Sequence, residues 1–198
     1  MEFRLTYKGQ LQPSANKGRP AHVHAIRREF HSQLKNFWGF HPYLRDAKLS
    51  HRKNGEVRPP KRLLDHLSDQ YAINGYNFVP LVTDTLSLHC GIDILFLRPE
   101  VPGDLIQSGD IDGRLKTVFD ALKMPTQKED LGGAPLPDDS EKPFYCLMSD
   151  DKLISRVSVE TDTLLQPTSE PPNKFDARLI IKVTLKPFDM GWDNISFS

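Results

Sequence analysis

Hydrophobic and polar residues alternate along several stretches of the chain, and this pattern predicts β-strands. The longest stretch is 85–98, in which Leu86, Leu88, Cys90, Ile92, Ile94 and Phe96 are separated by single residues. Because successive side chains of a strand point to opposite faces, these six would share one buried face. Shorter stretches at 2–8, 153–165 and 177–185 predict further strands, and Asn74-Gly75 predicts a hairpin turn within 71–79.

Two segments instead carry apolar residues at helical spacing. Residues 22–38 have an apolar stripe made of Ile26, Phe30, Leu34, Phe37 and Trp38. Residues 110–122 have a second stripe made of Ile111, Leu115, Val118, Phe119 and Leu122. Each stripe predicts an amphipathic helix that packs on the sheet by its apolar side. A shorter helix is expected to begin near Arg62.

Together these elements predict an α+β fold, with a mixed or antiparallel sheet and packed helices in two layers. The chain has 198 residues, of which 38% are hydrophobic, and this suits a single domain over 1–198 with one core. Residues 39–62 and the Pro- and Gly-rich residues 124–145 are expected to be loop insertions, the second either mobile or folded over the site. The tail after Pro187 is expected to be peripheral.

We expect neither an export signal nor a membrane span. No apolar run approaches the length needed to cross a bilayer, and the first residues lack an apolar segment with a cleavage site. Cys90 and Cys146 lack the spacing of metal ligands, so we expect both to be reduced. A cytoplasmic protein with no membrane partner is the expectation.

The net charge is zero, but the charge is unevenly divided. Residues 1–62 carry 14 Lys and Arg against 4 Asp and Glu, a net +10, and the rest carries the matching −10. This division predicts a basic surface that follows nucleic-acid phosphates. Its candidate residues are Arg27, Arg28, Lys35, Arg52, Lys53, Lys61 and Arg62. Alternatively, the two halves interleave in the fold and no basic patch forms.

Acidic residues and a lysine mark the second predicted helix. Asp112, Lys116 and Asp120 are four residues apart, so they would lie along one stripe, and Asp110 precedes them. Carboxylates suit Mg²⁺, and a lysine adds positive charge beside a phosphate. Aspartates also commonly cap helix N-termini, and an acidic pair such as Asp150-Asp151 commonly forms a turn, so a structural role stays open.

The order of these residues resembles that of the RusA-like family of Holliday junction resolvases. The matching residues are Asp110, Asp112, Lys116, Asp120-Ala121-Leu122 and the later Asp150-Asp151. The resemblance implies a RusA-like fold, with Asp110, Asp112, Lys116 and Asp151 as catalytic residues and Asp110, Asp112, Asp150 and Asp151 as metal ligands. Gly113 departs from the family, which usually has Asn there, and so does the long segment from Lys123 to Cys146.

The resemblance implies an endonuclease that depends on Mg²⁺, with Mn²⁺ as a possible substitute, and that hydrolyses phosphodiester bonds in branched DNA during recombination and repair. A homodimer is expected, because symmetrical cleavage of a four-way junction needs two related sites. Two alternatives stay open. One is a non-catalytic module of the same fold that binds nucleic acid or protein, and the other is a metal-dependent phosphohydrolase for a small substrate.

Overall fold

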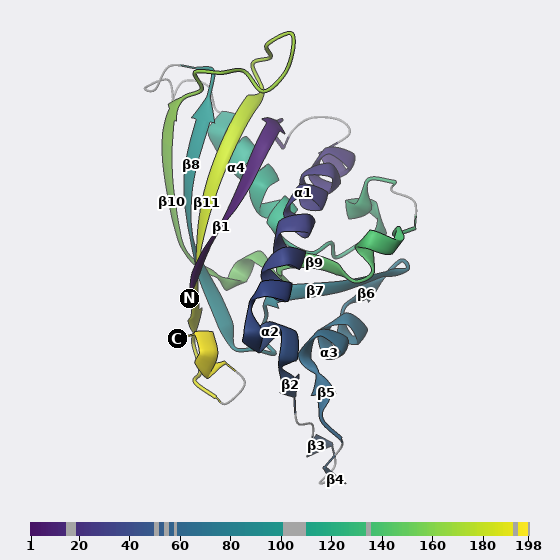
Figure 1. Ribbon diagram of the computed structural model, residues 1–198. Helices are drawn as coiled ribbons and strands as arrows, with labels where there is room; N and C mark the ends of the chain where they lie inside the picture. The colour runs from purple at the N-terminus through teal and green to yellow at the C-terminus, as the bar shows by residue number, and fades with distance from the viewer. Residues whose placement is uncertain are drawn as a thin grey trace.

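A sheet of four strands forms one side of the molecule (Figure 1). Its strands, in spatial order, are β1 (Glu2–Gln10), β11 (Asp176–Pro187), β8 (Leu88–Arg98) and β10 (Ile154–Thr163). β11 is antiparallel to both β1 and β8, whereas β10 is parallel to β8. The four strands predicted from alternation are therefore confirmed, and they form a mixed sheet. The fold class is α+β, as predicted.

The structure is a computed structural model that describes residues 1–14, 19–49, 52–53, 56–57, 59–100, 110–133, 136–191 and 194–197. For residues 52, 53, 56, 57, 110 and 195 it describes the backbone alone. Within these ranges, no helix is long and apolar enough to cross a membrane.

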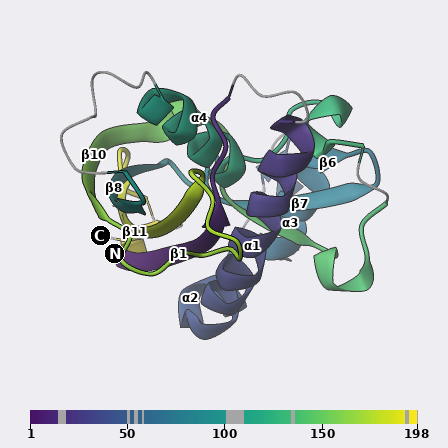
Figure 2. The same ribbon diagram turned by 90° about the horizontal axis from the view of Figure 1, so that it is seen from above.

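The core lies between the sheet and two helices, α1 (Arg19–Phe40) and α4 (Asp110–Leu122). Figure 2 shows α1 between the four-stranded sheet and a second, smaller sheet. Both predicted amphipathic helices are confirmed, because the apolar stripe of α1 and part of that of α4 are buried in one cluster with the inner face of the sheet. The buried helical members include Ile26, Phe30, Leu34, Trp38, Val118 and Leu122.

The second sheet consists of β6 (Ala72–Ile73), β7 (Tyr76–Val82) and β9 (Phe144–Met148). β6 and β7 form the predicted hairpin, and both turn residues, Asn74 and Gly75, have positive φ angles of 49° and 84°. β7 is parallel to β9. Sequence alternation does not predict β9, because all five of its residues are buried and form a short continuous apolar run.

The segment 39–62 is more regular than expected. It contains α2 (Pro42–Asp46) and two pairs of very short strands, β2 (Lys48–Leu49) with β5 (Lys61–Arg62) and β3 (Arg52–Lys53) with β4 (Glu56–Val57). These strands extend away from the two sheets at the bottom of Figure 1, next to α3 (Leu63–Gln70). α3 is the short helix expected near Arg62.

The segment 124–145 is a loop as predicted until β9 begins, with two 3₁₀ turns, η1 (Lys128–Leu131) and η2 (Asp139–Glu141). It lies against α1 at Gly132, which has a φ of 63°. A Cβ atom there would be 2.3 Å from the Cα of Ala21, so only glycine fits. The loop therefore packs against α1 at this point.

The tail after Pro187 ends in a 3₁₀ turn, η4 (Ile195–Phe197). Phe197 is fully buried in the main core, and the buried Asn194 donates a hydrogen bond from Nδ2 to the Leu86 carbonyl at 3.0 Å. The prediction of a peripheral tail is thus wrong for these two residues. The segment is held in place by only one aromatic ring and one amide. Two such side chains form no periodic pattern that the sequence could reveal.

Candidate functional site

α4 has one buried face and one exposed face. Val118, Ala121 and Leu122 are buried in the main core, whereas Asp112 and Lys116 are exposed. The predicted division of this helix into an apolar stripe and a polar stripe is therefore confirmed. The polar stripe is the candidate site, and its two ends differ.

At the N-terminal end, the segment after β1 crosses α4 at Gly113. The backbone N–H of Ser14 donates to the Gly113 carbonyl at 3.1 Å, and the Thr117 hydroxyl donates to the Gln12 carbonyl at 2.9 Å. A Cβ atom on Gly113 would be 3.2 Å from Cβ of Pro13 and 3.4 Å from N of Ser14. This close approach explains a glycine here, where the RusA-like pattern usually has Asn.

The side chains of Asp112 and Lys116 are exposed to solvent. Lys116 is four residues from both Asp112 and Asp120, a spacing that permits ion pairs on a helix. Within the described part of the chain, however, Lys116 forms no ion pair with either carboxylate, and Asp112 has no cationic partner. Asp110 is the first residue of α4, and its side chain lies outside the described residues.

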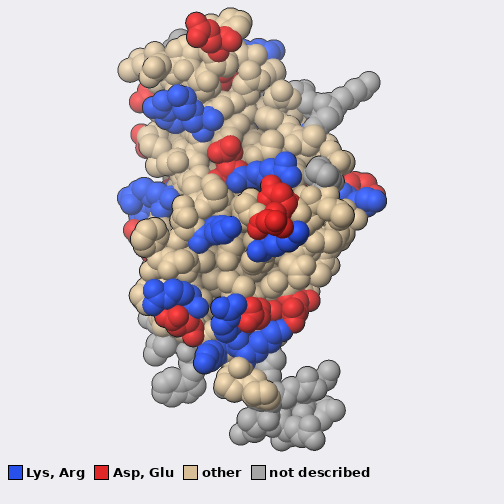
Figure 3. Space-filling view, turned by 45° about the vertical axis from the view of Figure 1, so that its right-hand side comes forward, with Lys and Arg blue, Asp and Glu red and all other residues tan. Residues whose placement is uncertain are grey.

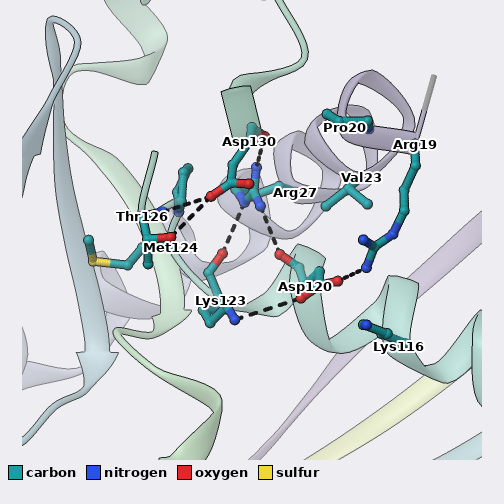
Figure 4. Close-up of a pocket in the computed structure, with 11 residues that line it drawn as sticks. Arg19, Pro20, Val23, Arg27, Lys116, Asp120, Lys123, Met124, Thr126 and Asp130 are labelled. Atoms are coloured by element: carbon teal, nitrogen blue, oxygen red, sulfur yellow. Dashed lines mark hydrogen bonds and ion pairs between the residues drawn. The ribbon is translucent and has the colours of Figure 1, made fainter. Parts of the chain in front are cut away.

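The C-terminal end of α4 holds a chain of ion pairs (Figure 4). Asp120 pairs with Arg19 of α1, and its Oδ1 is 3.7 Å from Nζ of Lys123. The same Nζ is 3.2 Å from Oδ2 of Asp151. Asp151 therefore lies beside the last turn of α4, where it shares the Lys123 ammonium with Asp120.

Asp150 has a local structural role. Its carboxylate accepts a hydrogen bond from the backbone N–H of Lys152 at 3.0 Å, and so caps the 3₁₀ turn η3 (Asp151–Leu153). This hydrogen bond is the main reason why the pKa of Asp150 lies below its usual value. The turn expected as the structural alternative for Asp150-Asp151 is present.

The structure does not bring the proposed metal ligands together. Asp112 and Asp120 are eight residues apart, which is about 12 Å along a helix axis, and Asp151 lies at the Asp120 end. Considering only described side chains, no three His, Cys, Asp or Glu residues lie close enough to hold a metal ion. Asp110 is outside this comparison. The set of Asp112, Asp150 and Asp151 is thus divided between the two ends of the helix.

Arg27 holds the C-terminal end of α4 from α1. Its side chain is buried, and it donates to the carbonyls of Asp120, Lys123 and Asp130 at 2.8, 3.0 and 3.3 Å. The carbonyls at a helix C-terminus lack partners within the helix, and a buried arginine supplies them here. The prediction that Arg27 contacts DNA phosphates is therefore wrong. Its helical position placed it on a basic face, but that face packs against main-chain oxygens.

His24 completes this buried group. Its Nδ1 lies 3.2 Å from Nη1 of Arg27, and because a guanidinium only donates, Nδ1 acts as the acceptor. Burial, together with the charges of Arg27 and Arg28, lowers the pKa of His24 to about 4. His24 is consequently neutral at ordinary pH.

The other basic candidates mostly have acidic or carbonyl partners. Arg28 pairs with Glu141 at 2.6 Å, Lys61 with Asp69, and Arg62 with Asp65 at 2.8 Å. Lys35 is exposed and donates to the Ser140 carbonyl at 2.8 Å. The side chains of Arg52 and Lys53 lie outside the described residues.

These pairs decide between the two interpretations of the charge division. Arg28, Lys61 and Arg62 belong to the basic part of the chain, and each pairs with a carboxylate of the acidic part. Figure 3 likewise shows basic and acidic side chains beside one another on the face in view. For these three residues the interleaving alternative holds, because a carboxylate of the acidic part balances the charge of each.

A cavity of about 200 Å³ lies between α1 and α4. Its lining includes the carboxylate of Asp120 and four cationic side chains, which are those of Arg19, Arg27, Lys116 and Lys123 (Figure 4). The first residues of the 124–145 loop line another side of it, among them Pro125 and Thr126. Arg19 and Lys123 were not predicted as site residues, although the spacing of Lys123 three residues after Asp120 permits their ion pair.

Comparisons with known proteins add no relative. No family model, no curated protein and no solved structure matches this chain. The resemblance to the RusA-like resolvases therefore depends on the residues of α4 and on Asp150-Asp151.

Proposed function

We propose that the chain is a divalent-metal-dependent endonuclease that hydrolyses phosphodiester bonds in branched DNA, as a homodimer, at the exposed face of α4. One observation carries the proposal. Asp112 and Lys116 are exposed, and neither uses the ion pair that their spacing offers, within the part of the chain that the structure describes. Opposite charges that stay apart on an accessible helix face are available for a ligand.

The chemistry of these side chains suits a metal and a phosphate. Asp112, with Asp110 at the first position of α4, offers the carboxylate oxygens that Mg²⁺ prefers, with Mn²⁺ as a substitute. A bound metal would stabilise charge on the attacked phosphate and help to make hydroxide from water. Lys116 would attract the phosphate one helical turn away, and Arg19 and Lys123 extend this positive charge along the cavity.

Asp150 and Asp151 are weaker parts of the proposal. Asp151 is engaged with Lys123, and Asp150 caps a turn. Either carboxylate would join Asp112 at a metal only if the turn moves along α4. The proposal therefore assigns the first metal contact to the N-terminal end of the helix.

The decisive experiment is cleavage of a synthetic four-way DNA junction. We expect the parent protein to cut in Mg²⁺ or Mn²⁺ and to stop when the metal is chelated. Asp112→Asn removes an anionic ligand without changing shape, so cleavage should be lost while junction binding stays at the parent level. Asp139→Asn is the matched control, because Asp139 is an exposed carboxylate that pairs only locally with Lys142; it should cut at the parent rate.

A second function is favoured by a different observation. Since no group of three potential metal ligands forms among the described side chains, a non-catalytic nucleic-acid-binding module of the same fold is the main competitor. It predicts junction binding that persists without metal and no cleavage under any condition. A parent protein that binds the junction but never cuts it, in Mg²⁺ or in Mn²⁺, would replace the nuclease by this function.

A further inference from the structure

The strand β10 leaves one edge of the four-stranded sheet open. It is the last strand in the sheet order, and no described strand pairs with its outer side. None of its ten residues is buried, in contrast to β8 and β11, which alternate between buried and partly buried residues. An open edge presents unpaired N–H and C=O groups, which are a template for another strand.

The opposite edge of the same sheet is blocked. The side-chain amide of Gln33, on α1, accepts a hydrogen bond from the Thr6 N–H at 2.8 Å and donates one to the Thr6 carbonyl at 2.7 Å. This amide takes the place of a neighbouring strand in the middle of β1. Among the described residues, no side chain blocks β10 in this way. β10 contains no Pro or Lys, which commonly protect an edge, and its one bulge lies at its start, between Ile154 and Arg156.

We propose that β10 pairs in antiparallel fashion with β10 of a second copy of this chain, about a two-fold axis at Ser158. In a regular antiparallel ladder, residues that lie opposite each other form one of two kinds of pair. Either both point their N–H and C=O groups toward the other strand, or both point them away from it. Because these directions alternate along a regular strand, the two-fold axis must fall on a residue. β10 is regular over residues 156–163, after a bulge between Ile154 and Arg156. Only a few axes are therefore possible within β10.

An axis at Ser158 is favoured by charge and by apolar contact. It places Arg156 opposite Glu160 of the other copy, and by symmetry this pair occurs twice. It also places Val157 opposite Val159, and Val157 is 46% exposed in the single chain. A valine pair would cover this apolar surface on both sides of the axis.

Neighbouring axes fit less well. An axis at Val157 would set Glu160 opposite Ile154, and an axis at Glu160 would set two carboxylates against each other. An axis at Val159 would pair Arg156 with Asp162, but it would leave Val157 opposite Thr161. The Ser158 axis alone among these satisfies the charges and pairs the valines.

The inference rests on the homodimer of the proposed function and assigns its interface. Its test is separate from cleavage, because β10 carries none of the residues assigned to the exposed face of α4. The test is the oligomeric state, measured by sedimentation equilibrium over a range of micromolar concentrations. We expect the parent to be a dimer. Arg156→Glu or Glu160→Arg alone places like charges opposite each other twice, and should raise the dissociation constant of the dimer about tenfold or more.

The double variant Arg156→Glu/Glu160→Arg restores opposite charges across the axis and should dimerise like the parent. Asp93→Asn is the matched control, since Arg156 also pairs with Asp93 of its own chain at 2.7 Å; this change should leave the dimer intact. Asp162→Arg should also have no effect, because the Ser158 axis sets Asp162 opposite the uncharged, bulged start of β10 at Ile154 and Ser155.

Several outcomes would overturn the inference. These are a parent that is monomeric throughout, single variants that dimerise like the parent, and a folded double variant that stays monomeric. Weakening by Asp162→Arg but not by Glu160→Arg would overturn the Ser158 register. If a charge reversal lowers the unfolding temperature, Arg156→Gln and Glu160→Gln can be used instead, because they remove the charge without reversing it. Each should weaken the dimer. If neither does, the result counts against the inference.

Discussion

The two ends of α4 carry similar residues but use them differently. At the C-terminal end, Asp120 and Lys123 form ion pairs with Arg19 and Asp151, and Arg27 binds the last carbonyls. At the N-terminal end, Asp112 and Lys116 stay apart and face solvent, within the described residues.

The difference shows that spacing alone does not assign a role to a charged residue. Lys116 and Lys123 are both within reach of Asp120 along the helix, yet the ammonium of Lys123 alone pairs with it. What distinguishes them is the neighbouring structure, since α1 and the turn before β10 supply further partners only at the C-terminal end. That end fixes the helix in the fold, and the other end is free to bind.

The largest expected effect is on the fixed end. Arg27→Met leaves three partly buried carbonyls without the guanidinium donor, and we expect it to lower the free energy of unfolding by about 3 kcal/mol or more. Urea unfolding followed by circular dichroism measures this change. Lys35→Met, at an exposed position of the same helix, is the control and should stay within about 0.5 kcal/mol of the parent. A stable Arg27→Met protein with weakened DNA binding would contradict the structural role.

The next effect concerns the open end and depends on the proposed function. If the Lys116 ammonium stabilises charge at the scissile phosphate, Lys116→Met should slow single-turnover junction cleavage by about a hundredfold. Because Lys116 has no ion pair to lose among the described residues, the unfolding temperature of the Lys116→Met protein should equal that of the parent. Lys142→Met, at another exposed lysine, should cut like the parent. A parent-like rate for Lys116→Met would make Lys116 an ordinary surface charge.

The helix α4 and the strands of the main sheet could be predicted from the sequence, because the periodicity of a helix or a strand is a local pattern. Burial of Val118 and Leu122 and exposure of Asp112 follow from positions on one helix. The environment of Arg27 could not be predicted in this way. Its partners are main-chain carbonyls of another helix, and main-chain atoms leave no signal in a residue pattern.

The place of Asp151 depended on an element that the pattern missed. β9 runs parallel to β7, and Met148 at its end bridges to Lys123 just after α4. This pairing brings the following turn to the last turn of the helix. Without β9, the resemblance to the RusA-like family was the reason to expect that the acidic pair would join Asp110 and Asp112.

The smallest expected effect on stability is that of Lys123→Met. This change tests the comparison between the two ends of α4 at the C-terminal end. The ammonium of Lys123 is partly exposed, so its two ion pairs should contribute no more than about 1 kcal/mol to the free energy of unfolding.

Lys123→Met also releases Asp151 from its cation. If Asp151 then becomes available as a metal ligand, cleavage should reach half its maximum at a lower Mg²⁺ concentration than in the parent, whereas Lys123→Arg should match the parent. A Lys123→Met protein with the stability loss expected of Arg27→Met would instead show that these ion pairs, and not the buried guanidinium, hold this end of α4. An unchanged Mg²⁺ requirement would argue that Asp151 contributes to the turn before β10 and not to the metal.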